Sequence, residues 1–539
     1  MTPRFTLWLE MLASRDCSML VLFLLAAVIV TFVYYARPWR WRLLWAGVMA
    51  FWWTFVVFVL VRPPSVPRPT FGVMLDDPPW YDETFTVAVA RLPFDRMLQA
   101  VAGDVHPPLW YIVEWAALRL LGDSVLAARL PALLLALASV GLTYRLARAF
   151  GYERETALWA AGLLALMPAQ VYYAQEARMY ALLQFCVLVA VLGLVERRPW
   201  LMGLGVLCIL YTHNLGLVFV AVIGLLALWR ERRLHGLRDA LWNADNGLLV
   251  VGASVLILWM PGLMLTLRQA QAVGRGFWVQ DAGLGGYLLP LYRSTLGMGA
   301  VDFFEQHAAL AAAGLAALAL WAALRDEGSG FVLLALVLGP ALLLAAISEL
   351  WRPVYLERFF VAALPMLALL AASALRRLRP DHRAPILAVL IPALAICLLF
   401  QDKGTEGRVA FARRVVEQCE PGDVIWHANL ASYIELSYYL PEADHICWPD
   451  AGNLQQALTI ETQAAMGIRR AEAVEVEADR LLVVWVENPL TTAAEARALE
   501  AALELGEARE LFVWEDSDLV KASVWEVRRE GNQDREFGD

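Results

Sequence analysis

A polar stretch at residues 76–111 carries the first group of side chains that could do chemistry. It contains the adjacent carboxylates Asp82 and Glu83 just ahead of a helix-like run. Asp82 could cap that helix, as aspartate often does. Shielded by neighbouring aromatic residues, it could equally serve as the general base for a hydroxyl group. Capping would explain one acid and leave Glu83 without a role, so residue type alone keeps both interpretations open.

The same stretch ends with Asp104 and His106, followed by Pro107 and Pro108. The prolines fix the backbone and favour a helix that starts at Leu109. One interpretation is a helix-start turn with incidental polar residues. The other is a functional pair, because imidazole and carboxylate can share a divalent cation, or the imidazole can face a phosphate.

Three later breaks in the apolar sequence bring Glu176, Arg178, His213 and Arg358. Glu176 and Arg178 do not share a helix face, so they need not neutralise each other. Arginine suits phosphate because its planar fork makes two parallel hydrogen bonds. A histidine such as His213 in an apolar setting is more often a structural residue than a ligand. Arg358 could also extend its guanidinium to the membrane interface.

These breaks interrupt a chain that is typical of a polytopic α-helical membrane protein. Its 539 residues are 60% hydrophobic with a mean hydropathy of +0.54, and apolar runs of about 17–25 residues recur. The net charge of -9 and the scattered arginines give no sign of nucleic-acid binding. We predict about 12 transmembrane helices, near 18–36, 43–62, 125–149, 155–174, 177–195, 199–213, 214–230, 247–266, 306–324, 330–348, 359–375 and 384–400.

Arginine-rich links predict how these helices are oriented. By the positive-inside rule the links at 37–42, 145–154, 196–198, 230–238 and 376–383 are cytoplasmic. Alternation then places the polar breaks described above on the outer side, and the N-terminus, which lacks a cleavable signal peptide, outside as well. The segment His106–Leu121 cannot span in this arrangement, so we predict interfacial helices in the first outer loop.

From about residue 402 the chain changes character. Helix-like runs at 407–419 and 491–505 alternate with short strand-like runs at 424–427, 481–487, 510–515 and 520–528. We therefore predict a transmembrane domain at 1–401 and a small extracytoplasmic α/β domain at 402–539. In the latter, Cys419 and Cys447 could form a disulfide, although two free thiols are the simpler interpretation.

Motifs over about residues 40–400 resemble the family 39/83-like glycosyltransferases of the GT-C superfold. This group includes protein O-mannosyltransferases and bacterial lipid A sugar transferases. The resemblance depends on an ordered set of motifs: YDETF (81–85), DVHPPLWYI (104–112), GDSVLAARLPALL (122–134), YYAQEARMYAL (172–182), YTHNLGL (211–217), GFWV (276–279) and LERFFVAALP (356–365).

The resemblance implies a glycosyltransferase in the bacterial cytoplasmic (inner) membrane, with its active site on the extracytoplasmic side. The donor would be a polyprenyl-phosphate sugar, and the acceptor a lipid, a glycan or a protein. Asp82 matches the family's catalytic acid, with Glu83 beside it. His106 and His213 match basic positions, the latter near the donor phosphate. Some relatives have glutamate and lysine where this chain has Val105 and His106.

The resemblance also bears on a cofactor. Glu176 matches a second-loop acid that in some members helps to bind a divalent metal ion. With Asp104 it is the candidate metal ligand of this chain.

The resulting hypothesis is an inverting transfer in which Asp82, aided by Glu83, deprotonates the acceptor. Charge on the leaving phosphate would be stabilised by a cation or by His106, Arg178, His213 and Arg358. Tyr81 and Trp110 would stack on the sugar or the prenyl chain. One alternative is a transporter or flippase of lipid-linked sugars, with the acids as a proton relay. Another is a membrane scaffold whose α/β domain binds envelope proteins.

Overall fold

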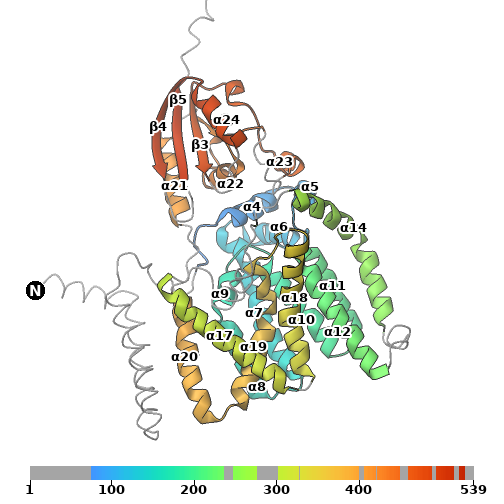
Figure 1. The fold of residues 1–539 in the computed structure, drawn as a ribbon. Coiled ribbons are helices and arrows are strands. Elements are labelled where there is room, and N and C mark those ends of the chain that lie inside the picture. The colour runs from blue at the N-terminus through green and yellow to red at the C-terminus, as the bar shows by residue number, and fades with distance from the viewer. Residues whose placement is uncertain are drawn as a thin grey trace, which may run out of the picture.

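The computed structural model shows a helical bundle with a small sheet-containing region at one end (Figure 1). It describes residues 74–235, 247–275, 279, 302–326, 328–399, 406–420, 422–449, 459–487, 493–514 and 521–528. The helices predicted at 18–36 and 43–62 lie outside these residues.

The bundle contains long apolar helices and a few short ones at their junctions. Its elements are α7 (Val125–Ala149), α8 (Arg154–Leu166), α9 (Pro168–Ala174), α10 (Tyr180–Val195), α11 (Pro199–Thr212), η1 (Asn214–Gly216), α12 (Leu217–His235), α14 (Leu248–Arg275), α17 (Asp302–Arg325), α18 (Ser329–Leu350), η3 (Glu357–Ala363), α19 (Leu364–Arg377) and α20 (Pro380–Leu399).

Within the described residues, five helices are long and apolar enough to cross a membrane. They cover 125–149, 214–233, 248–271, 329–350 and 358–377. A sixth results if α8 and α9, bent by 63° at their junction, count as one span. The bend follows from Pro168, which forces the preceding residue out of the helical region. α10 and α11 are apolar but have only 16 and 14 residues, so the total of about 12 spans stays a prediction.

α19 lies at the centre of the bundle, since the candidate span that it forms with η3, residues 358–377, is 94% buried in its apolar window. Its sequence LPMLALLAASALRR is rich in alanine and also contains serine. Small side chains let neighbouring helices approach closely, which is the usual basis of packing between helices in a membrane. η3, which carries Arg358, leads directly into α19 and is therefore anchored to this rigid centre.

Three short helices lie between the bundle and the sheet-containing region: α4 (Tyr81–Arg91), α5 (Phe94–Gly103) and α6 (Leu109–Leu121) (Figure 1). The 13 residues of α6 extend about 20 Å, which is less than the ~30 Å hydrocarbon core of a bilayer. α6 is not among the candidate spans of the described residues. These lengths agree with the expectation that the first outer loop carries helices that do not cross the membrane.

The C-terminal region is the expected small α/β unit. It consists of α21 (Glu406–Gln418), β1 (Val424–His427), α22 (Leu430–Tyr439), β2 (Asp444–Cys447), α23 (Ile460–Met466), η4 (Ala473–Glu475), β3 (Arg480–Glu487), α24 (Ala493–Leu503), β4 (Glu507–Trp514) and β5 (Lys521–Arg528).

The five strands have the order β2-β1-β3-β5-β4. β1 pairs in parallel with β2 and β3, whereas β5 pairs antiparallel with β3 and β4. The four predicted strand-like runs are all strands, whereas β2 was not predicted. Cys419 and Cys447 are both free thiols, so the disulfide considered above does not form.

The α/β unit shares a hydrophobic core with the short loop helices. Phe85, Met97 and Tyr111 of the loop helices pack in one buried cluster with Trp426 and Trp485 of the sheet. One buried cluster thus crosses the predicted division at 401/402, whereas a second cluster lies wholly within the α/β unit, and the division itself stays a prediction.

Two hydrogen bonds reinforce this contact. The Tyr439 hydroxyl donates to the Pro79 carbonyl at 2.6 Å, and the Thr462 hydroxyl donates to the Ala100 carbonyl at 2.8 Å. α5 approaches α23 so closely that a Cβ at Gly103 would lie 2.4 Å from the Thr462 hydroxyl oxygen. The α/β unit thus holds α4 and α5 in place from the side opposite the bundle.

Candidate active site

The centre of the site is the Asp82 carboxylate in the first turn of α4. Its Oδ2 lies 2.9 Å from Nη1 of Arg358 and 3.6 Å from Nη2 of Arg178. The three residues come from α4, from the turn between α9 and α10, and from η3. Trp80 is the N-cap residue of α4, and no side chain caps this helix. The capping interpretation of Asp82 is therefore wrong.

The charge of Asp82 is set by competing effects. Burial raises its pKa, but Arg178 and Arg358 outweigh this effect, with a further contribution from His106, and the pKa is lowered. The side chain is nevertheless 24% exposed. Asp82 is therefore an ionised carboxylate that is paired with cations yet open to a ligand.

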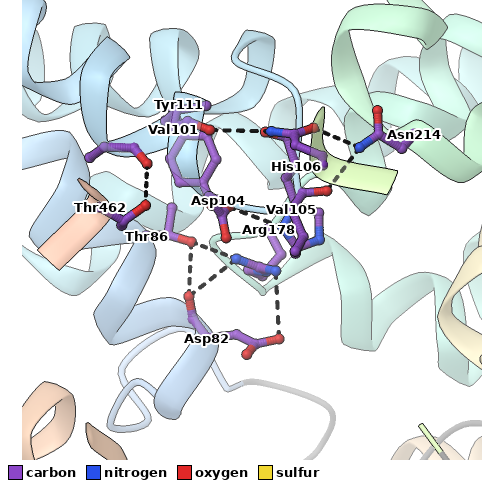
Figure 2. A network of polar contacts seen from close by, with 12 residues as sticks. Asp82, Thr86, Val101, Asp104, Val105, His106, Tyr111, Arg178, Asn214 and Thr462 are labelled. Atoms are coloured by element: carbon purple, nitrogen blue, oxygen red, sulfur yellow. Dashed lines mark hydrogen bonds and ion pairs between the residues drawn. The ribbon is translucent and has the colours of Figure 1, made fainter. Parts of the chain in front are cut away.

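Arg178 is almost completely buried and held by several contacts. Its Nη1 donates to the Thr86 hydroxyl at 3.0 Å and to the Asp82 carbonyl at 3.4 Å (Figure 2). Burial alone would lower the pKa of Arg178, but Asp82 outweighs this effect and the pKa is raised. A permanent positive charge thus lies beside α4.

Arg358 completes the pair of cations. Its Nη1 also donates to the Tyr180 hydroxyl at 3.0 Å. Its guanidinium carbon lies 5.5 Å from the centroid of the Trp80 ring, a distance typical of a cation–π contact. Arg358 is therefore directed into the site by three side chains and does not simply extend to the membrane interface.

Asp104 and His106 lie in the same polar network (Figure 2). Oδ2 of Asp104 accepts a hydrogen bond from the Tyr111 hydroxyl at 2.8 Å and lies 3.2 Å from Nδ1 of His106. The His106 side chain is 17% exposed. The imidazole is thus oriented by an acid and still reachable by a ligand.

The backbone around His106 is fixed by two amide side chains that the sequence analysis did not single out. Asn214 donates to the Val105 carbonyl at 2.9 Å and to the Gln269 side chain at 2.7 Å. Gln269 in turn donates to the His106 carbonyl at 3.0 Å. Asn214 lies in a motif named above, whereas Gln269 is one of several polar residues near the C-terminal end of α14. Nothing in the local sequence distinguishes it from them.

His213 is buried next to His106, with ring centroids 5.2 Å apart. Its Nδ1 accepts the Leu215 backbone N–H at 3.1 Å, which places the ring proton on Nε2. Burial lowers the pKa of His213 well below its usual value, and the charges of His106 and Arg178 lower it further. His213 is therefore a neutral imidazole that packs on Phe359.

Glu83 has a different environment from its neighbour. Its carboxylate makes a bidentate ion pair with Arg129, at 2.8 and 2.7 Å, and both side chains are fully buried. Oε1 also accepts the Ala177 N–H at 2.8 Å. The pair links α4, α7 and the Arg178 turn. These contacts occupy the Glu83 carboxylate, so the prediction that it aids Asp82 in deprotonation is wrong.

Arg129 was not identified from the sequence, although it lies in the GDSVLAARLPALL motif. It also donates to the carbonyls of Met74 at 2.7 Å, Leu75 at 3.0 Å and Asp77 at 2.6 Å. An arginine within a predicted apolar helix was the available signal, because charges there are normally satisfied by specific partners.

The two predicted stacking residues do not line an open site together. Trp110 is fully buried, and its Nε1 donates to the Ala177 carbonyl at 3.2 Å. No face of the ring is accessible, so its predicted role in substrate binding is wrong. Tyr81 is partly buried and packs against the core shared with the α/β unit; burial, with Asp82, raises its pKa.

The candidate metal ligands are used in other ways. Glu176 is buried, and its Oε1 accepts the Trp80 indole N–H at 2.7 Å. Asp104 is bonded to Tyr111 and His106, as described. Within the part of the chain that the structure describes, no three His, Cys, Asp or Glu side chains are grouped so that they could hold a metal ion. Each acid thus has another hydrogen-bond partner, and the role of Glu176 and Asp104 as metal ligands stays a prediction.

One further acid near the site was missed. Glu114 on α6 is fully buried, and neither carboxyl oxygen has a hydrogen-bond partner in the described residues. Burial, followed by the charge of Glu83, raises its pKa well above the usual range. Burial thus favours the neutral, protonated form of Glu114. Its signal in the sequence was a single acid inside the apolar run LWYIVEWAALRLL.

The arrangement of these elements matches known crystal structures. ArnT from Cupriavidus metallidurans in the apo state superimposes with a TM-score of 0.54 and 16% sequence identity, over 89% of this chain and 98% of ArnT. ArnT bound to undecaprenyl phosphate gives the same TM-score and identity, over 88% and 98% of the two chains. The chain has the GT-C fold.

A more distant similarity is to the apo oligosaccharyltransferase of Archaeoglobus fulgidus. It has a TM-score of 0.41 and 12% identity, over 87% of this chain and 69% of that one. No protein-family model matches the chain, and no curated protein matches its sequence.

Proposed function

We propose that the protein is a membrane glycosyltransferase that moves a sugar from a polyprenyl-phosphate donor to a lipid, glycan or protein acceptor. The observation that carries this proposal is the convergence of Asp82 with Arg178 and Arg358 at the end of a GT-C bundle. One structure with this fold, that of ArnT, is bound to undecaprenyl phosphate. An acid beside two cations suits a reaction in which a proton is removed and a phosphate leaves.

The two arginines are suited to bind the donor phosphate. A guanidinium presents paired N–H donors that match phosphate oxygens. As the bond between the anomeric carbon and the phosphate oxygen breaks, negative charge grows on the phosphate, and cations already in place stabilise it. His106 is a further candidate donor because it is partly exposed, whereas the buried, neutral His213 is better suited to position His106, against which it packs.

The proposed base is Asp82. Arg178 and Arg358 pair with the Asp82 carboxylate and lower its pKa. A carboxylate with a low pKa is a weak base. A bound donor phosphate would compete for both guanidinium groups, and the pKa of Asp82 would then rise. The acceptor O–H or N–H would give its proton to Asp82, its heteroatom would bond to the anomeric carbon, and polyprenyl phosphate would leave with the bonding electrons. A single displacement of this kind inverts the configuration.

Glu83 would support this step only indirectly. Its ion pair with Arg129 connects the helix of Asp82 to the turn of Arg178. We also propose that the site and the α/β unit face the outside of the cytoplasmic membrane. This orientation follows from the arginine-rich links at the other end of the bundle.

The test is sugar transfer by purified full-length protein in proteoliposomes. A panel of labelled polyprenyl-phosphate sugars is supplied, and released polyprenyl phosphate is measured. Asp82→Asn should lower the rate by about 10²–10⁴-fold, as expected for a lost acid–base group. The matched control is Asp95→Asn, an exposed aspartate in the next helix. A protein that moves the labelled lipid across the bilayer without cleaving it would be a flippase, and the proposal would be wrong.

A further inference from the structure

The end of the bundle away from Asp82 carries a hollow of about 300 Å³. α10 begins at Tyr180, which contacts Arg358, and ends at Val195 in the wall of this hollow. The 15 steps between these residues correspond to about 22 Å of helix. The hollow is therefore separate from the candidate active site. Apolar side chains form much of its wall, among them Leu226, Trp229 and Val332.

Two arginines line the same hollow, Arg197 after α10 and Arg230 near the end of α12. Arg230 is fixed in place because its Nη1 donates to the Leu194 carbonyl. Arg197 is exposed and makes no ion pair within the described residues. The neighbouring acid Glu196 is already paired with Arg145 at 3.1 Å and with Arg198 at 3.3 Å. Two guanidinium groups thus line the hollow, and none of its described lining residues is an acid.

The start of α18 adds to this positive potential. Ser329 is the first residue of this 22-residue helix and lines the hollow. No side chain caps the helix, so its first N–H groups and its dipole favour an anion. Two acids precede it in the sequence, of which Glu327 lies outside the described residues. The other, Asp326, is paired with Arg377 at 3.0 Å and accepts a hydrogen bond from Tyr152. It therefore does not cancel the field of the two arginines.

The backbone of Arg197 gives a separate indication that its side chain has a use. The φ angle of Arg197 is 57°, in the left-handed region. Among the described residues, no other non-glycine residue has a positive φ. The Arg198 N–H bonds to the Gly193 carbonyl at 2.8 Å, which is the helix ending that normally places glycine at the position of Arg197. Strain of this kind is found where a side chain is needed.

We propose that this hollow binds the phosphate headgroup of an anionic phospholipid from the adjacent leaflet. The phosphate would lie between Arg197, Arg230 and the start of α18, and an acyl chain would follow the apolar wall. A lipid fits better than a free anion because the cations border an apolar surface. Basic pockets between transmembrane helices commonly take such headgroups, and this end of the bundle is the arginine-rich one.

The experiment measures lipid binding to the full-length protein in detergent by native mass spectrometry. Phosphatidylglycerol and phosphatidylcholine with the same acyl chains are titrated separately, and inorganic phosphate is tested by thermal shift. We expect phosphatidylglycerol to bind more tightly than phosphatidylcholine and to raise the melting temperature, while inorganic phosphate does not. Equal binding of the two lipids, or equal protection by inorganic phosphate, would overturn the proposal.

Three variants sharpen this test. Arg197→Gln should weaken phosphatidylglycerol binding about fivefold, the effect of one basic side chain near an anionic surface. The control Arg198→Gln removes the next arginine, which does not line the hollow, and should change little. Arg197→Gly should raise the melting temperature without lipid, since glycine relieves the strained backbone, and still weaken lipid binding. If Arg198→Gln weakens binding as much as Arg197→Gln, or if Arg197→Gly leaves binding intact, the site is wrong.

Discussion

Asp82 and Glu83 are adjacent carboxylates in one helical turn, and each is paired with arginine. Asp82 is 24% exposed and meets two arginines at 2.9 and 3.6 Å. Glu83 is fully buried and meets Arg129 through two bonds of 2.8 and 2.7 Å. The first arrangement can exchange a partner for a ligand, whereas the second has no room for one.

This difference shows how one short motif can supply both chemistry and architecture. Successive residues in a helix point about 100° apart, so Asp82 and Glu83 face different surroundings. The buried pair also receives the Ala177 N–H, next to Arg178. Glu83 is thus a positioning residue for the cation that contacts Asp82. Substitutions around Asp82 should therefore mainly lower activity, whereas substitutions in the Glu83–Arg129 pair should mainly lower stability.

The largest expected effect is on turnover in Asp82→Asn. As proposed above, transfer should fall by about 10²–10⁴-fold. The melting temperature should fall less than when the fully buried Glu83–Arg129 pair is broken, because Arg178 keeps the Thr86 hydroxyl and the Asp82 carbonyl as hydrogen-bond partners and Arg358 is partly exposed. Initial rates and thermal melts of the same preparation check this prediction. A variant that unfolds instead would mean that Asp82 is structural, like Glu83.

The complementary change is Arg129→Leu. It leaves the Glu83 carboxylate buried without its partner, and breaking such a pair typically destabilises a protein by about 3–5 kcal/mol. Arg145→Leu on the same helix is the control, since its pair with Glu196 is largely exposed and should contribute at most about 1 kcal/mol. Denaturant or thermal unfolding in detergent measures both. Equal losses in the two variants would contradict the distinction drawn here.

The sequence predicted the loops of the site better than the contacts within them. Breaks in the apolar pattern located Asp82, Arg178, His213 and Arg358, because polar residues between membrane helices are costly and stand out. Their partners are set by packing over long separations, such as the 276 residues between Asp82 and Arg358. No local pattern encodes such a distance.

The same limit explains the errors. Trp110 and Tyr81 both lie beside polar motifs, and only the packing of the loop helices shows that the Trp110 ring is fully buried. Glu83 was given the role of its neighbour because sequence adjacency does not reveal which way a helical side chain points. The short apolar runs that form strands in the α/β unit are, in contrast, a local signal, and four of its five strands were predicted.

A smaller effect is expected for Arg358→Lys. Lysine keeps the charge but loses the planar fork, so kcat/KM for the donor should fall about tenfold, roughly one charge-assisted hydrogen bond. Asp82 would lose a direct hydrogen bond that lowers its pKa. Its pKa should therefore rise, and the acidic limb of the pH–rate profile should move to higher pH. Arg91→Lys, an exposed residue of α4, should leave the profile unchanged.

The smallest effect concerns Glu114, whose folded-state pKa is raised by burial. In the folded protein the Glu114 carboxyl group keeps its proton at pH values at which the same group is ionised in the unfolded chain. Stability is therefore complete below the unfolded pKa of about 4.5 and declines as the pH rises toward the folded value. Glu114→Gln resembles the neutral acid and cannot ionise. Its melting temperature should match the wild type near pH 5 and exceed it at pH 8. If the melting temperatures of the two proteins instead change with pH in the same way, the carboxyl group of Glu114 is ionised in the folded protein. Arg178 would then stabilise that charge, and the prediction would be wrong.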